Sequence, residues 1–464
     1  MRKIRSYQNG QALVLFLAFA AALTGILLVA FNSGQVSNAK MRAMNAADAA
    51  AYSGAVWQAR TLNFQAYMNR AMIVNEVTIA QSVSLRSWIN YLAKLVSNIN
   101  IVAKAFPPVG VVVQKVAMVV NTIEKNLQIT IPPLEDALRI ISLLEHDAQK
   151  VFNLSGAVVG QDLAREVAKM NGAELTAANE HWFAKNIYKW VEFTETYTKL
   201  SRPSIGSKDD GRKRLRDVAL NSRDGFTRER DWNLYLPPYR LRKQGGTDLI
   251  DYDSWKGMDS VAVCPIIFGC KPALPLGWGG AQAHSTVKAV GKVGKHGDIN
   301  SWGDVDGRLA RRAAIIAPNA HRFASMKKNL QFPDYRDIQN FDTNNLKANT
   351  LPFSVEVVIK EQNVPSASST FGAKSILIDG KVIDHDPQNI NEGGVYATAE
   401  ACVKFERPFD HQRHNGVVEF PSLFNPYWRA SLATERRDFR IFVDAVKGSV
   451  SLSRFSLNGG SCGL

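Results

Sequence analysis

An uncharged run at residues 12–31 (ALVLFLAFAAALTGILLVAF) constrains this chain more than any other stretch. At a rise of about 1.5 Å per residue, a helix of that length crosses the roughly 30 Å hydrocarbon core of a bilayer. Arg2, Lys3 and Arg5 precede the run, and the bulk of the chain follows it. The positive-inside rule therefore predicts a cytoplasmic head (1–11), a transmembrane anchor (12–31) and an exported remainder.

A cleavable secretory signal is the alternative interpretation of the same run. Such signals carry an apolar core of about 7–15 residues that ends in a small-x-small cleavage site. The run here is longer, and no such site followed by a clear break stands at its end. An uncleaved anchor is therefore the favoured interpretation.

The chain beyond the anchor is rich in helix formers. Residues 35–106 contain no proline and a single glycine, Gly54, which predicts a long helix or a tight hairpin of helices. Small residues recur at helical spacing inside the span and after it, namely Ala18, Ala21, Ala22 and Gly25, then Ala46, Ala50 and Gly54. This spacing lets helix backbones approach closely, so we expect the span to pack against a partner or a second copy. For the later residues the alternative, that alanine simply supports a helix, stays open.

Several of these features together resemble a known family. They are residues 10–14 (GQALV), the uncharged span, Gly34, and residues 45–51 (NAADAAA) followed by residues 53–55 (SGA). This pattern, over about residues 8–60, resembles the N-terminal module of the TadE/TadG-like Flp pilus-assembly proteins. The resemblance implies a bacterial inner-membrane protein that works with a type IV-like (tight adherence) pilus. Its implied partners are other pilus-assembly membrane proteins or pilins.

The resemblance also makes Gly10 and Gln11 a candidate prepilin-type processing site, but one residue departs from the pilin pattern. Pilin-like signals usually place a glutamate five residues after the processed glycine, and here that position is Leu15. The glutamate is thought to pair with a neighbouring subunit's freed N-terminus, and an unpaired charge in an apolar environment is costly. Without this carboxylate the chain cannot make that pairing, which puts processing and a role as the repeating subunit in doubt.

The middle of the chain changes character twice. Pro107-Pro108 breaks the first helical run, Pro132-Pro133 is expected to start another helix, and a further helix is expected over about 161–199, which makes residues 32–200 an exported helical domain. The aromatic residues near its end are expected to pack in the core: Trp182, Tyr188, Trp190, Phe193 and Tyr197. Residues 201–350 are basic and then glycine-rich, and are predicted to be a solvated linker or an anionic contact surface followed by irregular loops, including 277–307.

The last part, residues 351–464, is predicted to be a mainly antiparallel β domain with helix cover, so the fold class is α+β. Residues 354–360 are β-rich, residues 375–383 have the Asp-Gly signal of a hairpin, and residues 416–420 form a further short strand. Residues 395–405 alternate cleanly, with Val395 and every second residue after it on one face. An amphipathic helix is expected over 428–446.

Charge and cysteines add information about compartment. The 464-residue chain carries a formal charge of +14, which outside the cytoplasm favours anionic lipid headgroups or acidic polymers, and not nucleic acid, as partners. Four cysteines permit two disulfides, with three connectivities. In an oxidising compartment the spacing favours Cys264–Cys270, and the glycine-flanked tail could bring Cys462 to Cys402 on the polar face of its strand.

Motifs of catalysis are scarce. The chain contains no P-loop, no H-E-x-x-H and no G-x-S-x-G motif. Asp384-His385-Asp386 and Asp410-His411 with His414 could bind Zn²⁺ or Mn²⁺ if the sheet brought them together, but polar residues are expected at strand ends anyway. Some TadG-like proteins are associated with a metal-dependent adhesion domain that bears an Asp-x-Ser-x-Ser signature, which this chain lacks.

The sequence thus predicts a single-pass inner-membrane component of pilus assembly, without catalysis, cofactor or metal. Two alternatives stay open. One is a minor pilin-like tip or initiation subunit, which would tolerate the missing glutamate. The other is a membrane-tethered envelope hydrolase or metal enzyme that uses the region of His385 and His411.

Overall fold

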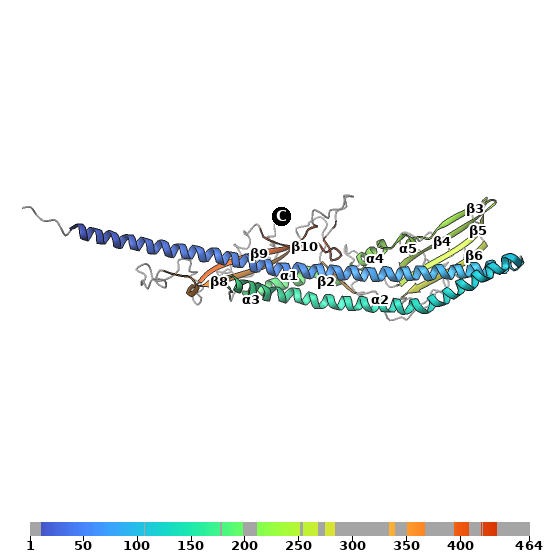
Figure 1. Ribbon diagram of the computed structural model, residues 1–464, viewed down its shortest axis with the longest axis horizontal. Coiled ribbons are helices and arrows are strands. Elements are labelled where there is room, and N and C mark those ends of the chain that lie inside the picture. Colours follow the sequence, from blue (N-terminus) through green and yellow to red (C-terminus); the bar gives the residue numbers. More distant parts are fainter. Residues whose placement is uncertain are drawn as a thin grey trace, which may run out of the picture. The chain divides into compact units, whose positions relative to one another are not determined.

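The structure is a computed structural model in which an α-helical N-terminal half precedes antiparallel sheets (Figure 1). It describes residues 11–105, 107–176, 179–197, 211–250, 254–267, 274–283, 334–338, 350–366, 394–407, 419 and 421–433. The predicted α+β fold class is confirmed.

Two long helices make up most of the first half of the chain. Helix α1 covers Gln11–Ala103 and α2 covers Pro107–Met170. The absence of proline from residues 35–106 lets α1 continue unbroken. Helix α2 begins at Pro107, where a proline is well tolerated because the first turn has no N–H partner to lose.

The expectation that a new helix starts at Pro132-Pro133 is wrong, because α2 runs through both prolines. A proline inside a helix removes one backbone hydrogen bond and crowds the preceding turn, but it does not by itself end the helix. Here Ile131 and Glu135, on either side of the prolines, are both buried. Packing therefore holds the helix together across the weak point.

The expected helix over 161–199 is also wrong in part. Helix α2 ends at Met170, and Gly172 follows in the left-handed region with φ of 72°. The N–H of Ala173 donates to the carbonyl of Ala168 at 3.0 Å, which closes the helix end in the manner typical of a glycine C-cap. After the short strand β1 (Glu174–Leu175), a separate helix α3 covers Asn179–Phe193 and leads into strand β2 (Thr194–Tyr197).

The chain divides into two compact units. Unit 1 comprises residues 1–64, 152–194 and 338–464, and unit 2 comprises residues 65–151 and 195–337. Helices α1 and α2 contribute residues to both units. A two-stranded sheet joins β2 to β7 (Tyr335–Ile338).

Unit 1 contains a four-stranded antiparallel sheet of order β1-β8-β9-β10, with β8 at Leu351–Lys360 and β9 at Gly394–Phe405. The 3-10 turn η2 (Glu361–Asn363) follows β8. The alternation predicted for β9 is confirmed from Val395 to Val403, since these alternate residues are buried, while Phe405 is half-buried. The predicted strand at 354–360 is confirmed as part of β8.

The amphipathic helix expected from residue 428 is wrong at its start, because Trp428–Leu432 is strand β10. Trp428 pairs with Phe405 of β9, and its side chain is buried in the core of unit 1. Burial of this large ring and pairing with β9 override the helical pattern. Residues 434–446 lie outside the described residues, as do those of the predicted hairpin at 375–383; of residues 416–420 only Glu419 is described.

Unit 2 contains a second four-stranded antiparallel sheet of order β3-β4-β5-β6. Its strands are β3 (Trp232–Leu236), β4 (Tyr239–Ile250), β5 (Ser254–Pro265) and β6 (Leu274–Ala283), and the helices α4 (Gly211–Asn221) and α5 (Gly225–Arg228) precede them. The prediction of a linker followed by irregular loops is therefore wrong for residues 232–236, 239–250, 254–265 and 274–283, which form strands. The glycines of β6 suggest a loop in the sequence, but in the structure they allow close packing of a strand.

Those glycines let β6 approach the backbone of α1. A Cβ built on Gly279 would lie 2.2 Å from the backbone nitrogen of Tyr91, and one on Gly277 would lie 2.6 Å from the Cβ of Leu95. Both distances are far shorter than real Cβ contacts, so no larger residue fits at either position. Glycine in this strand marks a close backbone approach rather than a loop.

Candidate functional site

The anchor predicted at residues 12–31 forms the start of α1, and its apolar side chains are uncovered. Among the described residues, α1 is the one helix that is long and apolar enough to cross a membrane. Leu13, Phe16 and Phe19 each expose well over half of their surface. An apolar surface of this size is unfavourable in water, so the segment fits a membrane-anchored protein.

The small residues of the span are also uncovered by the rest of the chain. Ala18, Ala21 and Ala22 are exposed, and a Cβ built on Gly25 would meet nothing within 4 Å. This face is therefore accessible to another helix.

The small residues after the span lie in a different environment, a buried stripe of α1 that we call the alanine seam. Its members recur every three or four residues, as one face of a helix requires. They are Ala39, Ala43, Ala46, Ala47, Ala50, Ala51, Gly54 and Ala55. The seven alanines belong to the hydrophobic core of unit 1, together with side chains of β8 and β9. The chain thus covers this stripe with its own sheet.

Phe353 of β8 fixes the position of the sheet on the seam. A Cβ built on Gly54 would lie 2.1 Å from Cε1 of this ring, and a Cβ on Gly160 of α2 would lie 3.5 Å from Cε2. Glycine at residue 54 therefore leaves the space that the ring occupies between α1 and α2. Phe353 is fully buried.

A second aromatic ring packs against a glycine of α2, in space that a larger residue would fill. A Cβ built on Gly156 would lie 2.3 Å from Cζ2 of Trp190 on α3, and the Trp190 Nε1–H donates to the carbonyl of Asn153 at 2.9 Å. The expected core role is confirmed for Trp182, Trp190, Phe193 and Tyr197, which are buried. It is wrong for Tyr188, which is half exposed on the outer face of α3.

Side-chain amides join the helices of unit 1 to the backbone of the sheet. The Asn63 amide donates to the carbonyl of Trp428 and accepts from its N–H, both at 2.9 Å. Asn186 of α3 makes the same double contact with Ser354 of β8, at 2.9 and 3.1 Å. Each amide satisfies one donor and one acceptor, which buried backbone groups need. The Lys40 ammonium adds a hydrogen bond of 2.7 Å to the carbonyl of Tyr396.

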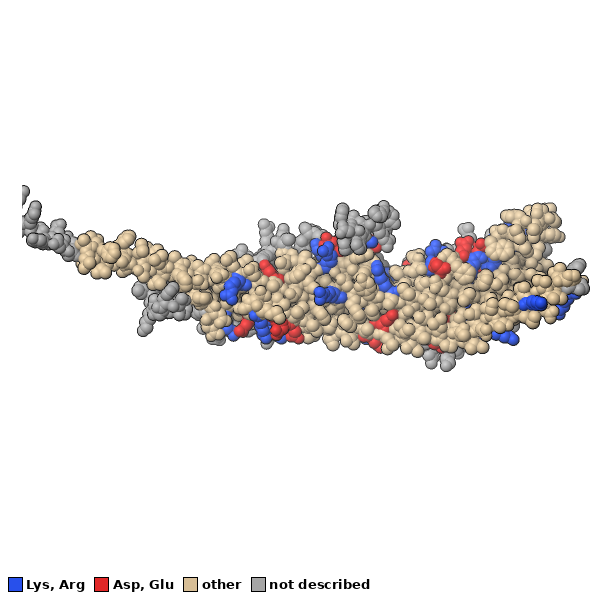
Figure 2. Space-filling model, viewed as in Figure 1, with Lys and Arg blue, Asp and Glu red and all other residues tan. Residues whose placement is uncertain are grey.

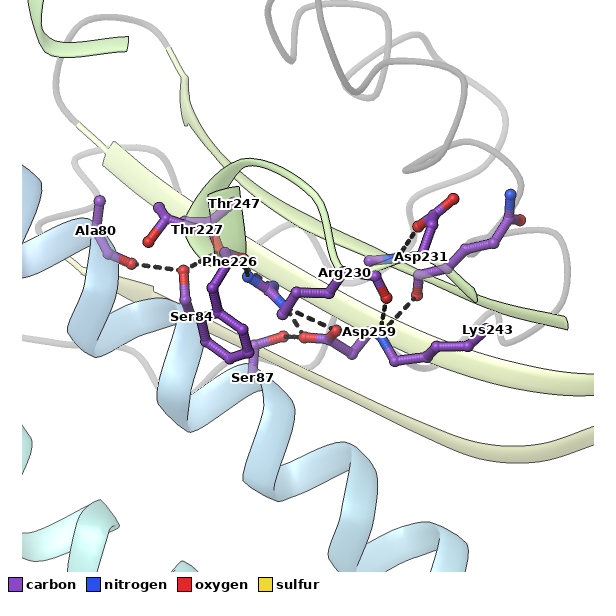
Figure 3. Close-up of polar contacts among 12 residues, drawn as sticks. Ala80, Ser84, Ser87, Phe226, Thr227, Arg230, Asp231, Lys243, Thr247 and Asp259 are labelled. Atoms are coloured by element: carbon purple, nitrogen blue, oxygen red, sulfur yellow. Dashed lines mark hydrogen bonds and ion pairs between the residues drawn. The ribbon is translucent and has the colours of Figure 1, made fainter. Parts of the chain in front are cut away.

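Unit 2 has buried charges and hydrogen bonds where β4 and β5 meet α1 (Figure 3). Asp259 of β5 is completely buried, and its carboxylate accepts from Arg230 Nε and Nη2, both at 2.9 Å, from Ser87 Oγ of α1 at 2.6 Å, and from Lys243 Nζ of β4. Ser84 of α1 donates to the hydroxyl of Thr247 on β4 at 2.7 Å. We call Asp259, Arg230, Lys243 and Ser87 the buried ion cluster.

The electrostatics of the ion cluster keep Asp259 charged. Burial by itself would raise the pKa of Asp259, but the positive charges of Arg230 and Lys243 outweigh it and hold the pKa below its ordinary value. Burial lowers the pKa of Lys243, and Asp259 opposes that effect. The four contacts occupy the lone pairs of the carboxylate. The cluster therefore suits a structural joint better than a catalytic or ligand-binding group.

A second buried group of charges lies between α1 and α2 in unit 2. Glu76 accepts from Trp255 Nε1 at 2.9 Å and lies 3.0 Å from Arg139 Nη2. Arg86 and Glu135 are 3.8 Å apart, which is longer than a charge-assisted hydrogen bond. Burial raises the pKa of Glu135 to about 8, although Arg86 counteracts it. We infer that Glu135 is mostly protonated at neutral pH.

Most of the remaining predicted site residues lie outside the residues that the structure describes. Gly10 is not among the described residues, nor are Cys270, Cys462, His385 and His411. Of the other cysteines, Cys264 and Cys402 are buried and neither is a free thiol. The expectation that Cys402 lies on an open polar face is wrong, but the two pairings stay predictions. Among the described residues, no group of three His, Cys, Asp or Glu side chains is placed to hold a metal ion.

The ion cluster could not be predicted from the sequence, because its basic residues belong to a stretch whose composition is typical of a solvated surface. Arg223, Arg230 and Lys243 are buried. The available signal was Asp259, the one acid in the otherwise apolar and small-residue stretch 257–265, because a buried acid needs a positive partner.

Comparison with known proteins adds one match. Residues 10–59, which include the span and the alanine seam, match the family model described as putative Flp pilus-assembly TadE/G-like. The predicted resemblance of the N-terminal module is thereby confirmed. No curated protein and no solved structure matches the chain.

Proposed function

We propose that this protein is a non-catalytic component of Flp-type pilus assembly, anchored in the bacterial inner membrane by residues 12–31. The match of residues 10–59 to the TadE/G-like pilus-assembly model carries this proposal. It supports involvement in pilus assembly and interaction with other pilus components. The uncovered apolar start of α1 supports the anchor.

The proposed orientation places the N-terminus in the cytoplasm and both units outside it. Arg2, Lys3 and Arg5 precede the span, and long segments after a first span cross the membrane largely regardless of their own charge. In the exported compartment, Cys264–Cys270 and Cys402–Cys462 are the proposed disulfides. Non-reducing peptide mapping of protein from the native host distinguishes these pairings from the alternatives.

The proposed role is assembly rather than polymerisation as the repeating subunit. Leu15 stands where a pilin-like signal usually has a glutamate. The alanine seam supports the same proposal, because a stripe covered by the chain's own β8 and β9 is not available for packing along a fibre. The uncovered Ala18, Ala21, Ala22 and Gly25 are the proposed contact with a partner helix in the membrane.

The test is deletion of the gene in the native host, with complementation by the full chain. We expect loss of surface pili on deletion and recovery on complementation, measured by electron microscopy and by immunoblotting of sheared pilin. Complementation by Gly25→Leu should be weaker than by Gly34→Leu, because both glycines are open on α1 but only Gly25 lies in the small-residue face of the span. Normal piliation in the deletion strain would refute the proposal.

A further inference from the structure

Three chain reversals lie together at one end of unit 2, which we call the turn end. They connect α1 to α2, β3 to β4, and β5 to β6. The strand register brings the two sheet turns together, because Tyr239 pairs with Pro265 and Val263 pairs with Leu274. The helical turn joins them, because Asn98 near the end of α1 donates to the carbonyl of Leu276 on β6 at 2.7 Å.

The turn end exposes large apolar side chains from all three reversals. Ile267 is 82% exposed and Ile101 is 69% exposed. The others from the same reversals are Ile99, Val102, Val109, Val111, Val112, Leu234, Tyr235, Leu236, Tyr239, Ile266 and Leu274. Apolar residues scattered singly over a surface need no explanation, but a concentration on adjoining turns marks an interaction site.

The charges near these turns have one sign. Residues 99–119, 232–242 and 261–276 contain no aspartate or glutamate. Lys104 and Lys115 are exposed, and Arg240 and Arg242 are partly exposed. Figure 2 shows this end of unit 2 at the right of the view. Its surface there consists mostly of uncharged residues (tan), with Lys or Arg (blue) among them.

Helix α2 extends the same surface away from the turn. Its exposed apolar residues recur at spacings of three and four, at Val109, Val112, Val116, Val119 and Ile123. Gly110 and Ala117, on the neighbouring stripe, are buried. One stripe of α2 thus packs on its own protein, and the other is apolar, flanked by lysine and uncovered. This composition is typical of a helix that lies at a membrane surface.

We propose that the turn end of unit 2 inserts into the headgroup region of a bilayer rich in anionic phospholipid. Apolar side chains enter the acyl boundary, tyrosines suit the interface, and lysine and arginine bind the anionic headgroups. A second copy of the chain fits less well, because two acid-free basic surfaces repel each other. The proposal rests on the turns themselves and does not depend on a role in pilus assembly.

The test is photo-crosslinking of the full chain reconstituted in vesicles. Benzoylphenylalanine replaces Val112, and the protein is reconstituted in phosphatidylcholine with or without phosphatidylglycerol, with matching vesicles added outside. We expect lipid adducts, identified by mass spectrometry, that increase with phosphatidylglycerol. The matched control is benzoylphenylalanine at Val151, which is as exposed on α2 as Val112 (68% and 61%) but adjoins the exposed pair Asp147–Lys150. It should give few adducts.

Charge variants separate anionic lipid from other occupants. Lys104→Glu with Lys115→Glu should reduce the adduct yield at residue 112 by about thirtyfold, since each of the two basic residues at such a surface contributes about 1 kcal/mol. Lys150→Glu on the same helix should leave the yield unchanged. Adducts that form equally without phosphatidylglycerol would overturn the proposal. So would protein–protein crosslinks in place of lipid adducts, which would identify a second copy as the occupant.

Discussion

One helix, α1, is buried in two different ways in the two units. In unit 1 it presents alanine and glycine to β8 and β9, and the contact is apolar and close. In unit 2 it also meets β6 closely, at Gly277 and Gly279, but its contacts with β5 are polar: Ser87 donates to Asp259, and Glu76 accepts from Trp255. The comparison shows that a helix can be joined to sheets either by shape or by charge, and the two joints should fail in different ways.

A joint made by shape tolerates pH and salt but does not tolerate added volume. A joint made by buried charge tolerates changes of volume at its edges but does not tolerate loss of one partner, because the other charge is left in an apolar interior. Variants of each kind, measured in the same full chain, therefore test the distinction directly.

The largest effect is expected in the ion cluster. Asp259→Asn keeps the size of the side chain but leaves Arg230 and Lys243 buried without their counter-charge. Breaking a buried pair in this way typically costs about 3–5 kcal/mol. Hydrogen exchange followed by mass spectrometry should show reduced protection of β4 and β5, with β8 and β9 unchanged.

The control for Asp259→Asn is Glu166→Gln, which removes one partner of an exposed pair with Lys169 at 3.5 Å. Exposed pairs contribute little, so protection should stay as in the parent protein. Unchanged protection of β4 and β5 in Asp259→Asn would show that the cluster does not hold the sheet.

A smaller effect is expected in the alanine seam. Gly54→Val adds a side chain whose first atom alone would lie 2.1 Å from the Phe353 ring. Overpacking of a core costs about 1–3 kcal/mol, and the expected loss of protection is confined to β8 and β9. Gly34→Val on the same helix is the control, because a Cβ there meets nothing within 4 Å. Combining Gly54→Val with Phe353→Leu should recover part of the loss, and no recovery would mean that the ring does not set the position of the sheet.

The sequence predicted the parts of the fold whose periodicity is simple. The apolar start of α1, the length of α1 and the alternating strand β9 follow from patterns that a single element produces by itself. The sheet of unit 2 could not be predicted in this way. In the sequence, Gly277 and Gly279 are typical of a loop. They are glycines because the α1 backbone, which is far away in the sequence, packs against them and leaves no space for a side chain.

The charged joint was hidden for a similar reason. Lys243 stands in a basic run that looks solvated, and only the pairing of β4 with β5 reveals that Asp259 is its partner. The alanine string is a family feature that the sequence shows, but Phe353, which packs at the end of the seam, is about 300 residues away and carries no local signal. Both joints are made by contacts between segments that are far apart in the sequence, and a local sequence pattern cannot predict such contacts.

The last prediction concerns Glu135, where burial and charge act against each other. Its pKa in the folded protein is raised to about 8, so the folded state binds the proton more tightly than the unfolded state, whose pKa is near the ordinary value of 4.5. The stability that this proton supplies is therefore complete below about pH 4.5 and is lost as the pH rises towards 8. Glu135→Gln imitates the protonated form at every pH. The variant should match the parent protein near pH 4.5, where the effect is smallest, and exceed its stability increasingly above that pH, by at most about 1.4 kcal/mol per pH unit. Denaturant unfolding from pH 4.5 to 8, with Glu166→Gln as the exposed control, measures the difference. A variant less stable than the parent throughout this range would show that Glu135 is ionised and paired with Arg86, and that unit 2 is joined by charge at this position too.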